Sequence, residues 1–261
     1  MLNMKTENSL SNTSISDENN FKNICKFACE DNYIFNNFKS NPSFNQILEH
    51  TTYEQGVGYI NEIEKLTKID MSLIEKFKTN DIQGNPKQFW YKEPYGNVSP
   101  STLRYIKVLN DLITLFGNLD DMSIVEIGVG YGGQSKIIQD HFNIKEYNFV
   151  DLPEVLGLTK KYLDMYDYKN LNFLNFNNLP NKKYDLIISN YAITECSKEM
   201  QDIYIEKIIY NSKHCYITGN DIGDHFNLKN YNKDEWGKKI PNSIFTEEKP
   251  LTHHKNYILY F

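Results

Sequence analysis

The sequence predicts an α/β fold in which a mainly parallel sheet is covered by helices on both faces. Two observations support it. Short apolar runs that end in polar residues alternate with stretches of helical apolar spacing, and one run enters its helix through a glycine-rich turn. In that turn, residues 122–135, Ile124, Val125 and Ile127 form a buried strand, and helical spacing resumes from Gly133. A strand, a glycine turn and a helix start are typical of a nucleotide-cofactor site.

The glycine spacing is compatible with two cofactors, and an acidic residue beside it favours one. Gly128, Gly130 and Gly133 satisfy the dinucleotide fingerprint GxGxxG, which alone is a weak signal. Glu126 stands two residues before the first glycine, where a carboxylate would repel a pyrophosphate but can accept from an ammonium group. S-adenosylmethionine (SAM) has an ammonium, a carboxylate and no phosphate. We therefore expect SAM; the alternative for Glu126 is a solvated strand-end charge.

The segment Val125-Glu126-Ile127-Gly128-Val129-Gly130 resembles the first motif of class I SAM-dependent methyltransferases. The resemblance implies a Rossmann-like sheet of seven strands, the last of which inserts antiparallel beside the fifth. After the first strand, the strands that we expect cover 147–150, 171–176, 184–190, 213–217, 243–245 and 256–261. An NAD-binding domain more often begins at its glycine turn, whereas residues 1–121 precede the turn here.

Composition and charge argue against several classes of partner. Of the 261 residues, 40% are hydrophobic and 24% are charged, which is ordinary for a globular protein. A net charge of −6 and a pI near 5.6 argue against a nucleic-acid partner. No apolar run reaches the ~20 residues that span a bilayer, and residues 1–20 lack the apolar core of a signal peptide. With four scattered cysteines, we expect reduced thiols and a cytoplasmic location.

The residues before the glycine turn divide into a polar tail and a helical region. Residues 1–18 are rich in Ser, Asn, Thr and acids, and we expect a disordered tail. Residues 19–100 show mainly helical spacing, in which Gly56 and Gly58 end one helix, and we interpret them as a cap that contacts substrate. A polar loop with aromatic residues precedes a typical helix start at 99–102. Residues 101–261 then form the cofactor-binding domain.

Residues at the carboxyl ends of the predicted strands are candidates for binding the donor, because ligands of doubly wound sheets lie there. Asp151 can accept from both ribose hydroxyls, or it caps the next helix. Phe176 stacks on the adenine or packs in the core, and Asn177 can bond to the adenine edge. The set that we expect around the cofactor is Glu126, Gly128, Gly130, Tyr131, Gln134, Asp151, Leu152, Phe176, Asn177, Asn190 and Tyr191.

Several segments between residues 44 and 220 together resemble a narrower group, the bacterial sugar O-methyltransferases. The segments lie at 80–86, 99–108, 124–134, 150–155 and 189–195, in the order of that group. The glycine motif alone is common, whereas the combination is specific. The chain departs from the group at Val129, where glycine is usual, and at Thr194, where serine is usual. The resemblance implies SAM as donor, S-adenosylhomocysteine (SAH) as product and a sugar as acceptor, without identifying the sugar or its hydroxyl.

Acceptor contacts are expected from the helix that starts at residue 99 and from aromatic residues. Arg104 and Tyr105 lie in the first turns of that helix, where they face either the cleft or the surface. Aromatic residues could form a platform for a sugar ring, although 19 tyrosines make chance clustering easy; they are Trp90, Tyr91, Tyr95 and Tyr191. The substrate set that we expect is Tyr95, Arg104, Tyr105 and His254.

Methyl transfer to a sugar hydroxyl is an in-line displacement that needs alignment and a base to remove the hydroxyl proton. The catalytic set is Glu195, His225 and Asp221, with His253 and His254 as further candidates. We favour Glu195 or His225. Glu195 could instead cap its helix, and single histidines are often surface residues. A divalent metal held by the catalytic set is not favoured, because its spacing is no recognised ligand pattern.

The sequence therefore predicts a SAM-dependent O-methyltransferase acting on a sugar of a surface glycan or its nucleotide-linked precursor. The alternatives are an NAD-dependent oxidoreductase or epimerase on nucleotide sugars and a non-catalytic SAM-binding module. An oxidoreductase or epimerase of this kind would carry a Tyr-x-x-x-Lys pair in the helix after the fourth strand. The chain lacks that pair, because Ile208 stands four residues after Tyr204. A homo-oligomer is compatible with the sequence, which predicts no partner beyond the acceptor.

Overall fold

The computed structural model describes residues 19–66 and 68–261. The predicted tail, 1–18, lies outside these residues. Seven strands form one sheet in the order β5-β4-β3-β6-β7-β9-β8. Strands β3 to β7 pair in parallel, whereas β9 pairs antiparallel with both β7 and β8. The strands are β3 Ser123–Ile127, β4 Glu146–Asp151, β5 Leu171–Asn175, β6 Tyr184–Asn190, β7 Ser212–Asn220, β8 Ile244–Glu247 and β9 Asn256–Tyr260. The predicted seven-stranded sheet is confirmed. Its last strand, β9, lies antiparallel beside β7, which is the fifth strand of this sheet along the chain.

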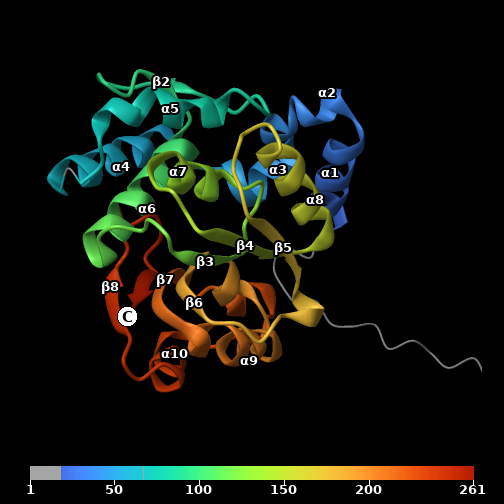
Figure 1. The fold of residues 1–261 in the computed structure, drawn as a ribbon, viewed down its shortest axis with the longest axis vertical. Helices are drawn as coiled ribbons and strands as arrows, with labels where there is room; N and C mark the ends of the chain where they lie inside the picture. The colour runs from blue at the N-terminus through green and yellow to red at the C-terminus, as the bar shows by residue number, and fades with distance from the viewer. Residues whose placement is uncertain (1–18, 67) are drawn as a thin grey trace, which may run out of the picture.

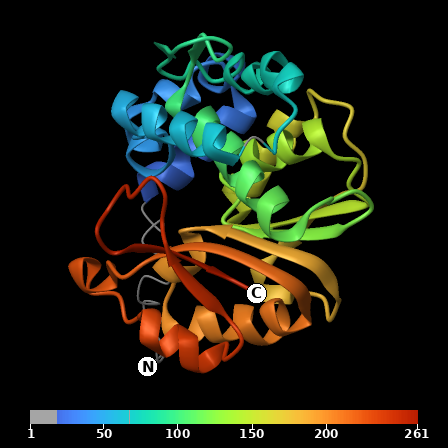
Figure 2. The same cartoon turned by 90° about the vertical axis from the view of Figure 1, so that its left-hand side faces the viewer.

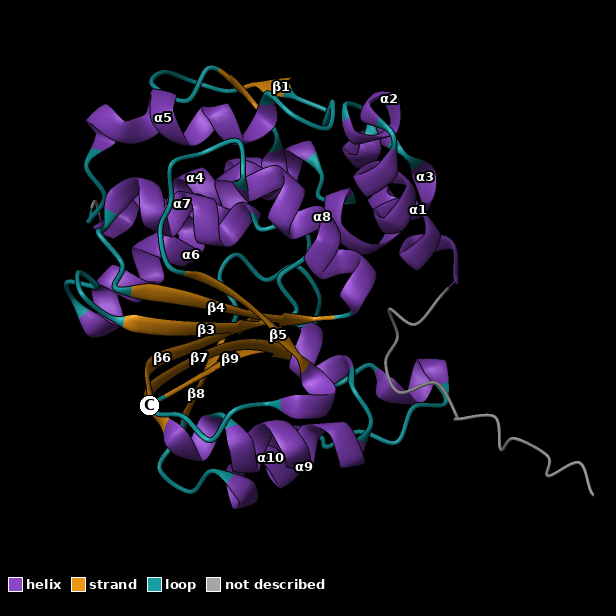
Figure 3. Cartoon of the chain, turned by 45° about the vertical axis from the view of Figure 1, so that its right-hand side comes forward, coloured by secondary structure: helices purple, strands orange, loops and turns teal. Residues whose placement is uncertain are grey.

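Helices cover both faces of this sheet, which gives the predicted layers (Figures 1 and 3). One face carries α6 Pro100–Phe116, α7 Gly133–His141 and α8 Pro153–Leu163, and the other carries α9 Lys198–Lys207 and α10 Lys233–Lys239. Ser99 caps α6 by accepting from the Thr102 N–H at 3.1 Å, as the helix-start pattern predicts. Within the described residues, no helix is long and apolar enough to cross a membrane.

The N-terminal helices pack onto α6, α7 and α8, so they extend the first face of the sheet (Figure 2). Helix α1 lies against α8, α4 against α6, and α5 against α7. One apolar core joins buried side chains of these helices, such as Phe21 and Ile60, to strand residues such as Ile188 and Tyr216. The elements are α1 Asn19–Glu30, α2 Asn32–Phe35, α3 Pro42–Phe44, α4 Tyr53–Leu66, α5 Ile74–Lys78 and the hairpin β1 Phe89–Trp90 with β2 Asn97–Val98.

The expectation that Gly56 and Gly58 end a helix is wrong, because both lie inside α4. A Cβ on Gly56 would meet the Tyr91 hydroxyl at 2.1 Å, and a Cβ on Gly58 would meet Pro250 at 2.9 Å. These glycines let the β1–β2 hairpin and the loop before β9 approach the helix closely. Helix interiors tolerate glycine at a cost of roughly 1 kcal/mol, which tertiary packing offsets here.

A buried polar network fixes the start of α6. Asp81 accepts from the Ser99 N–H at 2.5 Å, from the Ser99 hydroxyl at 2.8 Å and from the Thr102 hydroxyl at 2.6 Å. Asn80 donates to Thr102 Oγ1 at 2.7 Å and to the Tyr131 hydroxyl at 2.9 Å. Residues 80–81 and 99–102 are two of the segments that carry the family resemblance. Their contacts are structural, and they set the position of Arg104 one turn along the helix.

Candidate active site

The glycine turn after β3 is shaped by close contacts with two distant segments. Gly128 has a φ of 76°, and a Cβ there would meet the Ala192 Cβ at 1.9 Å. Gly130 has a φ of 54°, and its Cβ would meet Leu48 Cδ1 at 2.9 Å. Both positions need glycine because they combine a left-handed backbone with no room for a side chain. The turn therefore lies directly against the tip of β6 and a segment of the N-terminal region.

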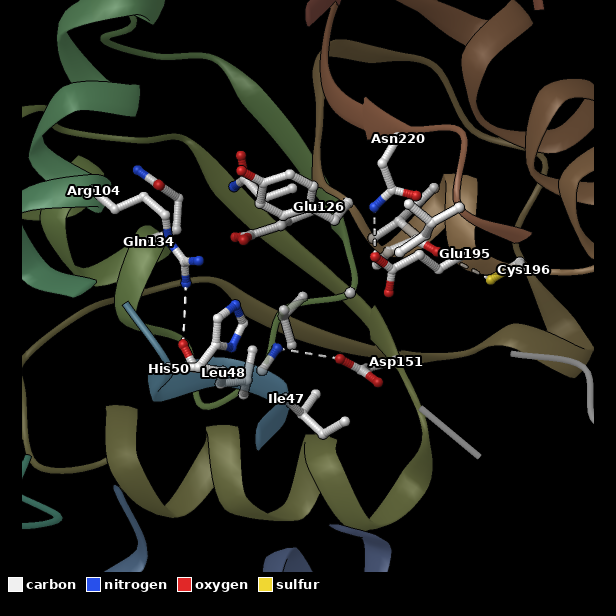
Figure 4. A pocket seen from close by; sticks show the side chains of 18 of the residues that line it. Ile47, Leu48, His50, Arg104, Glu126, Gln134, Asp151, Glu195, Cys196 and Asn220 are labelled. Atoms are coloured by element: carbon white, nitrogen blue, oxygen red, sulfur yellow. Dashed lines mark hydrogen bonds between the residues drawn. The ribbon is translucent and has the colours of Figure 1, made fainter. Parts of the chain in front are cut away.

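A cavity of about 740 Å³ opens beside this turn (Figure 4). It lies at the carboxyl ends of β3, β4, β6 and β7, where a doubly wound sheet binds its ligands. The expected cofactor residues that line it are Glu126, Gly128, Gly130, Gln134, Asp151, Leu152, Phe176, Asn190 and Tyr191. The structure thus brings together most of the predicted cofactor set, although its role in binding stays a prediction.

Two residues of the predicted cofactor set lie elsewhere. Tyr131 is 1% exposed and is packed among aromatic rings, with its centroid 5.5 Å from Phe38 and 5.1 Å from Tyr162. The Lys39 ammonium lies 4.1 Å from its ring centroid. Tyr131 therefore anchors the glycine turn in the core of the N-terminal helices. Asn177 is exposed in a short turn after β5 and is outside the cavity lining.

Glu126 ends deep in the cavity wall, where it is 2% exposed. Its Oε2 accepts from the Tyr147 hydroxyl at 2.6 Å. Burial raises the pKa of Glu126 to about 8, an effect that the Tyr147 bond opposes and the nearby Asp151 reinforces. The carboxyl is therefore available as an acceptor for a cationic ligand group, whose charge would favour its ionised form.

Asp151 ends β4 and faces the same cavity. Its oxygens accept from the Leu152 N–H at 2.7 Å and the Gly130 N–H at 3.2 Å, so the acid also braces the glycine turn. Burial raises its pKa to about 6, against the lowering effect of these backbone bonds. A carboxylate in this place can accept from a pair of ribose hydroxyls.

The catalytic candidates separate into one wall residue, one rim residue and one outside the cavity. Glu195 lines the cavity and accepts from Asn220 Nδ2 at 2.7 Å (Figure 4). Burial raises its pKa, and the Asn220 bond opposes that effect. His225 is exposed at the lining, with its Nε2 3.5 Å from the Lys255 ammonium. Asp221 is not part of the lining, and it accepts from the Lys233 N–H at 3.0 Å at the start of α10.

Two of the four substrate candidates line the cavity and two lie outside its lining. Arg104 and Tyr105 line the cavity, which settles the open choice between cleft and surface. Tyr95 is 1% exposed in the β1–β2 hairpin and lies outside the cavity lining. His254 is also outside it, although its neighbour His253 is a lining residue. Of the residues proposed as an aromatic platform, only Tyr191 lines the cavity; Trp90 is exposed and Tyr91 packs against α4.

Other lining residues were not identified from the sequence. The N-terminal region contributes His50, Gln55 and Tyr59, the loop before β9 contributes Thr252, and the start of β9 contributes Asn256. No motif marks these residues, because the two segments meet at the cavity only after folding. They place polar groups beside aromatic ones on the side of the cavity formed by α4 and the C-terminal loop.

The tip of β6 is held in an unusual conformation by that C-terminal loop. Tyr191 has a φ of 68°, a left-handed value that is uncommon for a bulky residue and that the surrounding structure must stabilise. Its hydroxyl donates to buried Glu248, which also accepts from Thr252 Oγ1 at 2.6 Å and Asn256 Nδ2 at 2.9 Å. This network fixes the Tyr191 ring in the cavity wall.

Potential metal ligands are scattered across residues 19–66 and 68–261. Groups of three or more His, Cys, Asp or Glu side chains that could hold a metal ion are absent from these residues. Glu195, His225 and Asp221, the ligands considered from the sequence, do not form such a group.

Comparisons with known proteins give matches to solved structures alone. No family model and no curated protein matches the chain. Over 60% of its length it aligns with 95% of an rRNA methylase from Streptococcus thermophilus, at 17% identity and a TM-score of 0.44. It aligns similarly with 83% of the N-methyltransferase NodS from Bradyrhizobium japonicum in complex with SAH, at 12% identity and a TM-score of 0.47. At such TM-scores we draw no argument from these likenesses, and the strand order establishes the architecture.

Proposed function

We propose that this chain is a SAM-dependent O-methyltransferase that acts on a hydroxyl group of a sugar, in a surface glycan or its nucleotide-linked precursor. The observation that carries the proposal is Glu126, a buried carboxyl at the cavity wall directly before a glycine turn. The ammonium of SAM would favour the ionised form of this carboxyl, whereas the ionised form would repel the pyrophosphate of a dinucleotide.

The residues of the cavity fit such a donor. Gln134 is 2% exposed, and its Oε1 has no hydrogen-bond partner among the described residues, so a ligand N–H would satisfy it. Together with Glu126, it offers two acceptors for an ammonium group. Asp151 would take the ribose hydroxyls, and Phe176 would lie against the adenine.

Bound SAM supplies a methyl group activated by a sulfonium. We propose that Glu195 takes the proton of the attacking sugar hydroxyl, because it lines the cavity and has a single side-chain partner in Asn220. A carboxylate with a raised pKa is a better base than an ordinary one. His225 remains the second candidate, at the rim of the same cavity. The catalytic contribution of the cavity walls would be to hold the acceptor oxygen in line with the methyl group.

We propose a sugar acceptor from the family resemblance and from the polar and aromatic residues on the side of the cavity formed by α4 and the C-terminal loop. Its hydrogen-bonding groups include Gln55, Thr252 and Asn256, and the rings of Tyr59 and Tyr191 lie on the same cavity. Polar groups beside aromatic faces suit the hydroxyls and the apolar face of a sugar ring. Because Gln55 and Tyr59 belong to the N-terminal region, residues 19–100 would act as the acceptor-binding cap.

Calorimetric titration of the purified chain with SAH, NAD and NADP tests the donor assignment. We expect micromolar binding of SAH and none of the dinucleotides. With the donor established, a screen of sugar acceptors with labelled SAM tests the acceptor class. Binding of a dinucleotide alone would replace this proposal with redox chemistry on nucleotide sugars.

A further inference from the structure

Arg104 is the single arginine among the 28 lysines and arginines of the chain, and it lies in the wall of the cavity. Every other basic side chain of that set is a lysine. A lysine supplies a positive charge, but only the planar guanidinium offers paired N–H donors that match a carboxylate. The one arginine of the chain therefore lies where a ligand in the cavity can contact it.

The guanidinium has donors left over for a ligand. Its Nη2 donates to the Leu48 carbonyl at 3.3 Å, and its centre lies 5.4 Å from the Tyr105 ring (Figure 4). Among the described residues, no carboxylate forms an ion pair with it; Glu49 acts on its charge only from beyond ion-pair distance. An arginine has five N–H donors, and a partly buried cation without a paired anion is unfavourable.

The atoms next to Arg104 suggest which carboxylate would bind. Gln134 Nε2 donates to the carbonyl of Tyr105, the residue after Arg104, at 3.1 Å. This bond orients the amide so that Gln134 Oε1 remains an unused acceptor in the wall. Glu126 lines the same cavity. A cationic fork close to acceptors for an ammonium is complementary to the two charges of an α-amino acid.

We propose that Arg104 is a carboxylate-binding site of this cavity, and that its fork holds its ligand through paired hydrogen bonds. The inference rests on the proposed function and deepens it. Two sources share this chemistry: the α-carboxylate of the donor, which the Gln134 and Glu126 acceptors favour, and the carboxylate of an acidic sugar acceptor. In either case Arg104 selects its ligand by the shape of the anion as well as by its charge.

Calorimetry with two nucleoside ligands tests the donor as the source. SAH carries the amino-acid end, and 5′-methylthioadenosine is the corresponding thioether without it. We expect Arg104→Met to weaken SAH binding about 10- to 100-fold and to leave methylthioadenosine binding unchanged, as for the loss of a charged hydrogen-bonded pair. Arg104→Lys keeps the charge and should still lose about tenfold, because it lacks the fork. Lys65→Met, at an exposed position of α4, is the charge-removal control.

The acidic acceptor is tested by saturation-transfer NMR with glucuronate and glucose on the SAH-loaded protein. Loss of the glucuronate signal in Arg104→Met, with SAH affinity unchanged, would place the carboxylate on the acceptor. The proposal is overturned if Arg104→Met keeps both ligands at wild-type affinity, or if Arg104→Lys equals wild type. Equal loss of SAH and methylthioadenosine also overturns it, since Arg104 would then only shape the cavity. Failure of wild type to bind SAH would instead refute the proposed function.

Discussion

Glu126, Asp151 and Glu195 all line the cavity, and their different neighbours give them different properties. Glu126 accepts a hydrogen bond from the Tyr147 hydroxyl, and burial raises its pKa to about 8. Asp151 has two backbone donors, which hold its pKa nearer its ordinary range, at about 6. Glu195 accepts from the Asn220 amide, and burial raises its pKa. Residue type alone did not distinguish these three acids, whereas burial and hydrogen-bond partners give each a different environment, and their separate roles stay proposals.

The raised pKa of Glu126 predicts a pH-dependent donor affinity. A bound ammonium favours the ionised carboxylate and lowers this pKa, so binding releases a proton when the free group is protonated. We expect SAH affinity to rise between about pH 6 and pH 8, with a net proton release in calorimetry across buffers of different ionisation enthalpy. Glu126→Gln should bind more weakly and lose this dependence. A wild-type affinity that is flat over this range would contradict the role of Glu126.

The same group also affects stability. Its folded-state pKa lies above its unfolded value of about 4.3, so its contribution to the free energy of unfolding is complete below that pH. The contribution is lost progressively as the pH rises through about 8. Glu126→Gln should therefore become more stable relative to wild type as the pH is raised from about 5 to 9, which urea titrations at several pH values would measure.

Glu195 is expected to act on turnover without acting on donor binding. Glu195→Gln keeps the shape of the side chain and removes its basicity, so kcat should fall roughly 10²- to 10⁴-fold while the SAH dissociation constant stays unchanged. In wild type, the rate should decline on acidification through a pKa above the usual one for glutamate. His225→Gln is the paired variant. Loss of turnover in that variant alone would transfer the role of base to His225.

At the scale of single elements, α4 and α6 show how packing overrides or supports local sequence. Helix α6 begins where its capping residue predicts, because Ser99 is both a helix cap and a partner of Asp81. Helix α4 continues through two glycines, because the hairpin and the loop before β9 contact it there. Figure 2 shows that C-terminal loop reaching the N-terminal helices, which explains how remote segments share the cavity.

Two helical glycines give a matched pair of substitutions. A Cβ at Gly56 would meet the Tyr91 hydroxyl at 2.1 Å, whereas a Cβ at Gly237 in α10 has its nearest neighbour, Phe245, at 3.6 Å. We expect Gly56→Ala to destabilise by about 1–3 kcal/mol through overpacking. Gly237→Ala should stabilise by about 0.4–1 kcal/mol because it restricts the unfolded chain. Thermal unfolding of both variants measures these changes, and a stable Gly56→Ala would show that the hairpin moves freely from α4.

At the scale of the whole molecule, the N-terminal helices and the sheet share one apolar core. The core includes Phe21 and Ile63 from the N-terminal helices, Leu103 from α6, and Ile188 and Tyr216 from the sheet. A second core on the other face packs α9 and α10 against the same strands. Both cores contain side chains of the same strands. Loss of packing on one face of the sheet would therefore destabilise the strands on which the other core depends.

This shared architecture predicts a single cooperative unfolding transition. Trp236 is fully buried in the second core, whereas Trp90 is exposed in the hairpin on the opposite side. In Trp90→Phe, fluorescence reports on Trp236 alone, and far-UV circular dichroism reports mainly on the helices. The two midpoints should coincide, and SAH should raise both together. Separate transitions would show that the helical region folds independently, as the predicted boundary near residue 100 suggests.

The sequence by itself determined the order of strands and helices, the glycine turn and the acids at the strand ends, because these depend on short-range patterns. The apolar run at 186–188 predicted β6, and the spacing of Gly128 and Gly130 predicted the turn after β3. Only the tertiary structure decided which polar residues reach the cavity. It buried Tyr131 and Tyr95 away from the site and brought His50 and Asn256 to it. Such placements depend on packing between segments far apart in the chain, which local patterns do not encode.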